Sequence, residues 1–327
     1  MLNPSFEYFR HVEADIERTR RKLVSDVSQY SPALSLGAES LVSKRLRNAK
    51  VPVLGELVPW LLSDLFGLRT EEVQEIATAW LKVYLYTCFI DDALDESKRL
   101  NPNETLSSSI LFQEGSATLF NFVRNTKYET LLRRSFYLSA EGELLDIEER
   151  SSISTDKTIS AKKKNYVFLA CAAALAAQAH NNGQAIIEFS EAILLGLQYL
   201  DDIADWDKDY SHENYTRLLS SAMNRSALNK EEITRNELLK ILVRSGSLGV
   251  LLQETREIIE RGILIALPNK RADGSAANVF LRTLFVLIRF AEAEVLNANE
   301  RMQLPGCDYA AVLDRVEKAL IKIAQSS

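Results

Sequence analysis

The chain has 327 residues, of which 46% are hydrophobic and 26% charged, and this composition is typical of a globular protein with a large apolar core. The formal net charge of −6 and the pI near 5.4 argue against nucleic-acid binding, which requires a basic surface. Three cysteines are too few for a disulfide scaffold, so we expect reduced thiols and a cytoplasmic protein.

The sequence gives no sign of membrane insertion. The first 22 residues lack the basic and then apolar order of a signal peptide. The longest wholly apolar run, residues 167–177, is too short to cross a bilayer. We therefore expect no membrane span.

Proline placement favours an all-α fold. Residues 103–267 contain no proline and are rich in Ala, Leu, Glu and Lys, which favour helices. Alternating polar and apolar residues between turn dipeptides, which would indicate a sheet, are not found. The prediction is one all-α domain over residues 1–327, with about a dozen helices.

In chain order, a helix is predicted over residues 5–30, followed by a basic helix or loop over 38–50 and another helix after the prolines of 51–59. A capping signature at Thr70 opens a helix over 70–96, and Pro102 then breaks the chain. The later helices are expected at 105–125, 127–150, 158–181, 184–209, 230–246, 248–266, 275–301 and 308–325.

The predicted 70–96 helix ends in an acidic cluster. An apolar run leads into Asp91, Asp92, Asp95 and Glu96, and at helical pitch Asp91 and Asp95 share one face. A helix that is apolar all round is usually buried, so these carboxylates are predicted at the mouth or in the wall of a cavity. Cations would relieve their mutual repulsion.

A second acidic cluster ends the predicted 184–209 helix. Its apolar run leads into Asp201, Asp202 and Asp205, and Asp209 extends the same helical face. A single cluster of this kind is more often a solvated helix end. The recurrence after a second apolar helix favours a site at which the two clusters face each other.

The two clusters together suit magnesium and a diphosphate. Mg²⁺ prefers carboxylate oxygens and commonly bridges protein to substrate phosphates. The apolar runs would line a pocket with the aromatic residues Trp80, Tyr84, Tyr86, Phe89, Tyr166, Phe168 and Tyr199. Loss of diphosphate from an allylic substrate would leave a carbocation, which aromatic faces stabilise.

Four segments, in this order, resemble motifs of the class I isoprenoid synthase superfamily, which includes trans-prenyl diphosphate synthases and class I terpene synthases. IDDALDE resembles the first aspartate-rich motif, and residues 140–147 resemble the GQxxD-type helix. Residues 164–169 are similar to the KTxxLF stretch, with Asn165 in place of threonine. Residues 196–209 are similar to the second aspartate-rich motif, with Gln198 retained.

The resemblance implies an isoprenoid-synthase-type helical bundle around a deep apolar cavity, Mg²⁺ (three ions) as cofactor, and a prenyl diphosphate as substrate. It also implies a homodimer as one expected assembly. The implied catalytic metal ligands are Asp91, Asp92, Asp95, Asp201, Asp202 and Asp205, with Asp209 as a further ligand. The implied diphosphate contacts are Lys164, Gln198, Lys208 and Arg289.

The chain departs from the pattern of chain-elongating members. Lys44-Arg45-Leu46-Arg47 lacks the glycines and proline of their GGKRxRP segment, and no RRG follows the first acidic cluster. Tyr84 stands where a histidine would fall. These departures favour a terpene synthase that ionises one C15 or C20 prenyl diphosphate.

The alternative is a short-chain prenyl diphosphate synthase that condenses an allylic diphosphate with isopentenyl diphosphate. In that case Tyr86, five residues before Asp91, is predicted to close the pocket. Two other classes remain: a helical partner protein without activity, and a di-iron bundle. The di-iron reading is weak, because such sites use pairs of Glu-x-x-His motifs and this chain offers only the single Asp209-x-x-His212.

Overall fold

The structure, a computed structural model, describes residues 4–47, 54–68, 70–95, 101–149, 152, 157–179, 181–226, 233–268 and 275–324. These residues form helices and their connections and contain no strand, so the all-α prediction is confirmed. None of the described helices combines the length and the hydropathy needed to cross a membrane.

The first half of the chain contains α1 (Pro4–Tyr30), α2 (Pro32–Val42), the π-helical turn η1 (Ser43–Arg47), α3 (Leu54–Phe66), α4 (Thr70–Asp95), α5 (Pro102–Val123) and α6 (Glu129–Glu149). The middle contains α7 (Thr158–Lys164), the 3₁₀ turn η2 (Asn165–Val167), α8 (Phe168–Gln178), α9 (Gly183–Ala204) and α10 (Trp206–Ser211). The last part contains α11 (Arg217–Ser226), α12 (Arg235–Arg244), α13 (Ser247–Ala266), α14 (Ala276–Arg301) and α15 (Tyr309–Ala324).

Local sequence explains several helix starts. The Ser31 hydroxyl caps α2 and the Asn101 side chain caps α5, and in both helices proline occupies the first turn, where its missing N–H is not needed. A full capping box between Thr234 and Glu237 opens α12.

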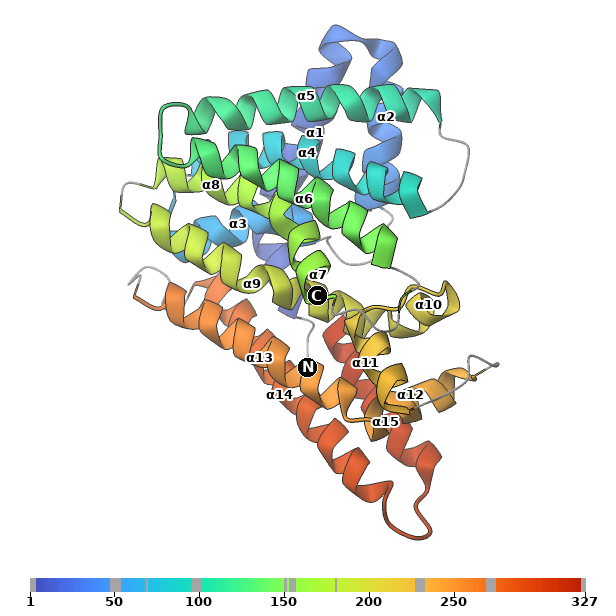
Figure 1. The fold of residues 1–327 in the computed structure, drawn as a ribbon. Helices are drawn as coiled ribbons and strands as arrows, with labels where there is room; N and C mark the ends of the chain where they lie inside the picture. The colour runs from blue at the N-terminus through green and yellow to red at the C-terminus, as the bar shows by residue number, and fades with distance from the viewer. Residues whose placement is uncertain are drawn as a thin grey trace.

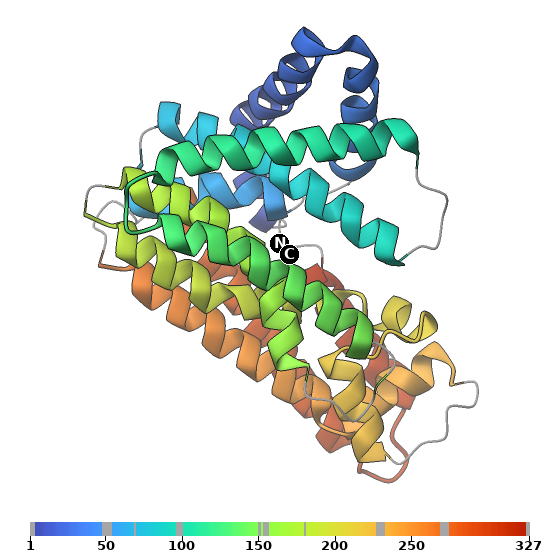
Figure 2. The ribbon, with the colours of Figure 1, turned by 45° about the horizontal axis from the view of Figure 1, so that its top comes forward.

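Four central helices position the site. In Figures 1 and 2, α4, α6, α8 and α9 lie between α5 on one side and the α13–α14 pair on the other. α4 packs against α5 and α8, and α9 packs against α8 and α13. One apolar cluster extends from Tyr8 to Ile323, with Trp80 fully buried in it.

Two predicted helices are broken. The segment expected as one helix over 158–181 is α7, η2 and α8, with the 3₁₀ turn beginning at Asn165. The helix expected over 184–209 ends at Ala204, and Asp205 (φ −107°, ψ 12°) joins α9 to α10. α11 lies between the predicted helices 184–209 and 230–246, in a stretch for which no helix was predicted. These breaks matter because both lie at the site.

Candidate active site

A cavity of about 270 Å³ opens among the central helices. Its lining comes from α4, α6, α9 and the α7–η2–α8 segment. The lining residues are Tyr84, Thr87, Cys88, Asp91, Ser139, Glu143, Lys164, Asn165, Val167, Phe168, Leu197, Gln198 and Asp201. Polar groups from α4, α6, α7 and α9, together with Asn165 of η2, therefore share one cavity with the aromatic rings of Tyr84 and Phe168.

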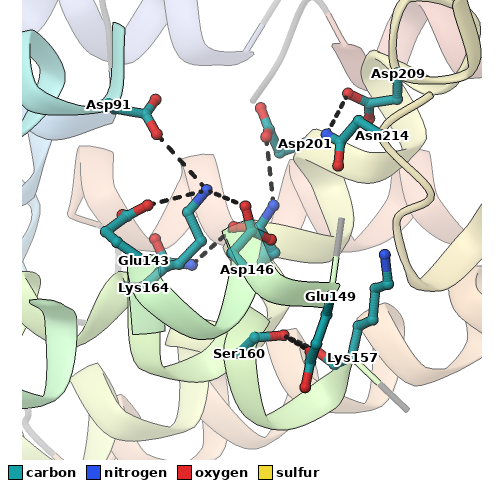
Figure 3. Close-up of polar contacts among 12 residues, drawn as sticks. Asp91, Glu143, Asp146, Glu149, Lys157, Ser160, Lys164, Asp201, Asp209 and Asn214 are labelled. Atoms are coloured by element: carbon teal, nitrogen blue, oxygen red, sulfur yellow. Dashed lines mark hydrogen bonds and ion pairs between the residues drawn. The ribbon is translucent and has the colours of Figure 1, made fainter. Parts of the chain in front are cut away.

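The two acidic helices both reach this cavity. On α4, Tyr84, Thr87, Cys88 and Asp91 line it, a spacing that follows one face of the helix. On α9, the lining residue Asp201 belongs to the second acidic cluster. Figure 3 shows Asp91 and Asp201 on either side of Lys164. The predicted convergence of the clusters is thus present for Asp91 and Asp201.

Lys164 lies at the centre of the acidic groups. Its Nζ is 3.2 Å from an oxygen of Asp146, 3.4 Å from Glu143 and 3.7 Å from Asp91 (Figure 3). Burial opposes the charged amine, but Asp146, Glu143 and Asp91 outweigh it and raise the pKa of Lys164 above its ordinary value. Lys164 is therefore a fixed positive charge in the cavity wall.

Gly142 allows the close approach that places Lys164. A Cβ atom at Gly142 would lie 2.4 Å from the backbone nitrogen of Lys164 and 2.5 Å from the carbonyl carbon of Lys163. The Ser139 hydroxyl, one turn earlier on α6, donates to the Lys164 carbonyl at 2.8 Å. α6 and α7 are thus in backbone contact at the site.

A chain of amides orders the second cluster. The Asn165 side chain donates to Oε1 of Gln198 at 3.2 Å, and Nε2 of Gln198 donates to Oδ1 of Asp202 at 3.1 Å. The same nitrogen is 3.5 Å from Asp201. Asp202 is 2% exposed and is not among the residues that line the cavity. The 3₁₀ turn that begins at Asn165 therefore contributes to the site, because it places the Asn165 side-chain amide against Gln198.

Four carboxyl groups at the site have raised pKa values. Burial raises the pKa of Asp202 to about 8, and that of Glu143 and Asp209 to about 7. Crowding by the surrounding protein, and the carboxylate of Asp205, raise the pKa of Asp201 to about 6, although Asp201 still contacts solvent. The site thus concentrates carboxylates that water solvates poorly.

Other predicted ligands of the second cluster lie close by. The Asn214 side chain donates to Oδ1 of Asp209 at 3.0 Å (Figure 3). Lys208 Nζ is 3.5 Å from Asp205, and both side chains are well exposed. Arg289 lies on α14 with its guanidinium 5.9 Å from the Phe285 ring centroid, and it is not among the lining residues.

Of the first cluster, Asp91 and Asp92 are described in full. Asp91 is half exposed at the cavity, and Asp92 is exposed. The backbone of Asp95 ends α4, whereas its side chain and all of Glu96 lie outside the described residues.

Two of the predicted pocket aromatics line the cavity. Tyr84 and Phe168 do so, and their rings pack on Trp80 with centroid distances of 5.8 and 5.3 Å. Tyr84 is two helical turns, about 10 Å, from Asp91 along α4. The cavity therefore has an acidic part and an aromatic part.

The remaining aromatics pack elsewhere. Tyr86 packs against Phe112 in a tilted arrangement, with the ring centroids 4.6 Å apart, and it is not among the residues that line the cavity. It therefore does not close the pocket as predicted. Phe89 is buried in a second apolar cluster. Tyr199 is 1% exposed, with Arg217 4.8 Å from its ring centroid, and Tyr166 lies half-buried in η2. These four side chains lie on faces of their helices that do not line the cavity.

Sequence reasoning did not assign Thr87, Cys88, Glu143 or Asp146. Thr87 and Cys88 could have been found by counting back from Asp91 in steps of three and four residues. Glu143 and Asp146 lie in the motif at residues 140–147, but the approach of α6 to Lys164 appears only in three dimensions.

The donor chemistry fits a divalent cation. Carboxyl groups from three helices line one cavity: Asp91 of α4, Glu143 of α6 and Asp201 of α9. The raised pKa values of Glu143 and Asp201 reflect charge that is poorly solvated. Hard oxygen donors of this kind suit Mg²⁺, which commonly takes one or two carboxylates together with waters and substrate phosphates. Among the described side chains, no three His, Cys, Asp or Glu residues are grouped closely enough to hold a metal ion.

No model of a protein family and no curated protein matches the sequence. Solved structures do match the fold. The polyprenyl synthase of Roseobacter denitrificans is 16% identical, with a TM-score of 0.66 over 86% of this chain and 98% of that chain. The heptaprenyl diphosphate synthase of Staphylococcus aureus is 14% identical, with a TM-score of 0.66 over 85% and 97%.

A third match is the polyprenyl synthase of Caulobacter crescentus, solved with calcium and isoprenyl diphosphate. It is 20% identical, with a TM-score of 0.62 over 84% of this chain and 97% of that chain. At these identities the likeness concerns the fold, and it spans nearly the whole of each neighbour. The chain therefore has the same all-α fold as these synthases, which agrees with the fold that the resemblance of the four motifs implied.

Proposed function

We propose that this protein is a Mg²⁺-dependent prenyltransferase that joins an allylic diphosphate to a second isoprenoid diphosphate. The observation that supports it most is a single cavity lined by Asp91 and Asp201 from two helices, by Lys164, and by Tyr84 and Phe168. The acidic and basic groups in one part of the cavity suit a metal-bound diphosphate. The aromatic part of the cavity suits a hydrocarbon tail.

The metal would be held by the aspartates of both clusters. Asp91 on α4 and Asp201 on α9 line the cavity, and Asp92, Asp95, Asp205 and Asp209 are the further proposed ligands. When bound, Mg²⁺ would neutralise the diphosphate and stabilise it as a leaving group. Asn214 keeps Asp209 oriented through its hydrogen bond to Oδ1.

Lys164 would contact the diphosphate directly. Its amine lines the cavity between Asp91 and Asp146 and stays protonated because its pKa is raised. Gln198, whose amide is ordered by Asn165, lines the same cavity and would add a neutral donor. These side chains would orient the diphosphate before the bond breaks.

At the reacting carbon, the C–O bond breaks and its electron pair leaves with diphosphate. The alkene of the second substrate would supply the electron pair of the new C–C bond. The released diphosphate would then accept the proton that is lost from the adjacent carbon. The Tyr84 and Phe168 rings, packed on Trp80, present aromatic faces to the tail and exclude water there.

The fold comparisons favour transfer over cyclisation. The sequence alone placed a terpene synthase first, yet the matching structures are named as polyprenyl, heptaprenyl and geranylgeranyl diphosphate synthases. Those activities belong to the neighbours. They make the condensing enzyme, which was the alternative, the better proposal for this chain.

A terpene synthase stays the second candidate because of Lys44. This lysine lies in the segment that resembles a second-substrate site, and its amine pairs with Glu104, which also accepts from the Ser40 hydroxyl at 2.6 Å. Burial opposes the charge on Glu104, but the bonds from Lys44 and Ser40 lower its pKa. A lysine held in this way is less available to a diphosphate.

The test is incubation with Mg²⁺ and labelled geranyl, farnesyl or geranylgeranyl diphosphate, with and without isopentenyl diphosphate. We expect a longer diphosphate that forms in the presence of the second substrate. A hydrocarbon or alcohol formed without it would contradict transfer and support the terpene synthase. If no allylic diphosphate is consumed under either condition, both candidates fail.

Asp91→Asn and Asp201→Asn are each expected to lower turnover by about two or more orders of magnitude. Removal of one group that stabilises charge in a transition state typically has an effect of that size. Folding should persist, because each change removes repulsion between carboxylates. Asp314→Asn, which removes an exposed pair with Lys318 on α15, is the matched control. Turnover and melting temperature are measured together, and a loss of stability with full activity would count against the site.

A further inference from the structure

The short helix α10 carries part of the second acidic cluster on one side and an anchor on the other. Asp209 accepts from Asn214, and the carboxylates of Asp201 and Asp205 raise its pKa beyond the effect of burial. On the remaining positions of α10, Trp206 is 3% exposed and Asp207 is partly buried. The direction of α10 therefore sets where Asp209 stands relative to Asp201.

Arg235, the first residue of α12, holds the anchor side. Its Nε donates to Oδ2 of Asp207 at 2.7 Å, and its Nη1 donates to Glu317 of α15. The guanidinium carbon is 5.0 Å from the centroid of the Trp206 ring. One side chain thus joins α10, α12 and α15.

The placement of Arg235 is not explained by α12 itself. A cation in the first turn of a helix meets the positive end of the helix dipole, which is unfavourable. α12 already has a complete capping box from Thr234 and Glu237. The contacts of Arg235 with Trp206 and Asp207 therefore account for the arginine.

α10 needs an external anchor because it is short. Its six residues follow a break at Asp205, and an isolated helix of that length is not stable in water. We propose that Arg235 is a positioning residue that holds α10 so that Asp205 and Asp209 stay beside Asp201 at the diphosphate site. This role rests on the proposed function, and Arg235 itself is not among the residues that line the cavity.

The first test uses hydrogen–deuterium exchange without metal or substrate. In Arg235→Gln, amides of residues 206–214 should exchange about tenfold faster, which corresponds to losing one exposed ion pair and one cation–π contact. Amides of α4 should not change. Arg235→Lys, which keeps the charge but not the planar fork, should lie between the wild type and Arg235→Gln.

The second test measures binding of inorganic diphosphate at increasing Mg²⁺. Arg235→Gln should need several-fold more Mg²⁺ for half-maximal binding and should bind the same amount at saturation. Arg235→Lys should restore part of the affinity. A purely structural role would instead lower the melting temperature and the amount of competent protein, and leave the Mg²⁺ midpoint unchanged.

Arg133→Gln is the matched control. Arg133 pairs with Glu129 at 3.1 Å, and its guanidinium carbon is 4.7 Å from the Phe120 ring centroid, so it combines the same two contacts away from the acidic helices. It should leave both readouts unchanged. If Arg235→Gln behaves like Arg133→Gln in both, the proposal is overturned.

Failure of the proposed function has a different result. Wild-type protein that binds no diphosphate at any Mg²⁺ concentration would overturn the proposed function. The exchange measurement would still establish whether Arg235 holds α10, because it needs neither metal nor substrate.

Discussion

At the scale of single residues, Asp202 shows how burial at the site opposes the ionisation of a carboxyl group. It is nearly fully buried, accepts from Gln198, and its pKa is raised to about 8 by burial and by neighbouring carboxylates. The unfolded chain titrates such a group near 3.9. Because the folded pKa is the higher one, ionisation of Asp202 disfavours the folded state.

The stability of the metal-free protein should therefore depend on pH. The contribution of Asp202 is fully present below about pH 4 and is lost as the pH rises through about 8, the folded pKa. In chelator, the contribution of Asp202 to the free energy of unfolding should fall by on the order of 3 kcal/mol between pH 5.5 and 8.5. Urea denaturation at several pH values measures this change.

Asp202→Asn separates this effect from other titrating groups. An amide cannot ionise and can still accept from Gln198, so the variant should show a flatter pH dependence and higher stability at pH 8.5. Parallel profiles for the two proteins would show that Asp202 is not the responsible group.

Asp91 and Asp201 were predictable, because each ends an apolar run and belongs to a cluster of aspartates at helical spacing. Glu143 and Asp146 were not, because their approach to Lys164 depends on the packing of α6 against α7. The aromatic residues were less predictable. Tyr84 and Tyr86 both belong to the apolar run, and the sequence does not say which face of that run meets Phe168 of α8 and which meets Phe112 of α5. Arg289 had no periodic pattern to link it to the site.

At the scale of helices, the contact between α6 and α7 holds Lys164 in place. Gly142→Ala would put a Cβ atom against backbone atoms of Lys163 and Lys164, which cannot rotate away as a side chain does. We expect a loss of stability of roughly 1–3 kcal/mol, as in other overpacked contacts. Lys164 should also move away from Asp146, and diphosphate binding should weaken.

Gly249→Ala on α13 is the control for this variant. The nearest atom to a Cβ there is a Val295 methyl at 3.7 Å, an ordinary contact. The change should raise stability by about 0.4–1 kcal/mol, because alanine restricts the unfolded chain. Denaturant unfolding and diphosphate titration of both variants test the pair. Equal stability of Gly142→Ala and wild type would contradict the close contact.

The positions of the helices along the chain were largely predictable, whereas two breaks were not. Proline and capping residues mark the starts of α2, α5 and α12. Asn165 and Asp205 break helices without proline or glycine, and their turns depend on Gln198 and on the packing of α10. Those contacts are tertiary, so local sequence does not reveal them.

At the scale of the molecule, the packing of α4 against α3 and α8 limits the cavity. The Tyr84 ring lies over Gly55 of α3, where an added Cβ would be 2.4 Å from the ring, and beside Phe168 of α8. A shorter side chain at 84 should lengthen the apolar part. Tyr84→Ala should therefore shift products, or the preferred allylic substrate, toward longer chains.

Tyr86→Ala is the matched comparison, because Tyr86 is an aromatic of the same helix that packs on Phe112 instead. It should leave the chain length of products unchanged. Product lengths are compared by mass spectrometry of the released diphosphates. A shift in Tyr86→Ala, with none in Tyr84→Ala, would place the end of the cavity at Tyr86.

The most direct measurement is a crystal structure of the protein with Mg²⁺ and an unreactive thio analogue of an allylic diphosphate. We predict that metal ions join the diphosphate to Asp91 and Asp201, that Lys164 contacts the diphosphate, and that the tail ends against Tyr84 and Phe168. A diphosphate bound outside this cavity, or a cavity that stays filled by protein side chains at saturating ligand, would contradict the proposed site.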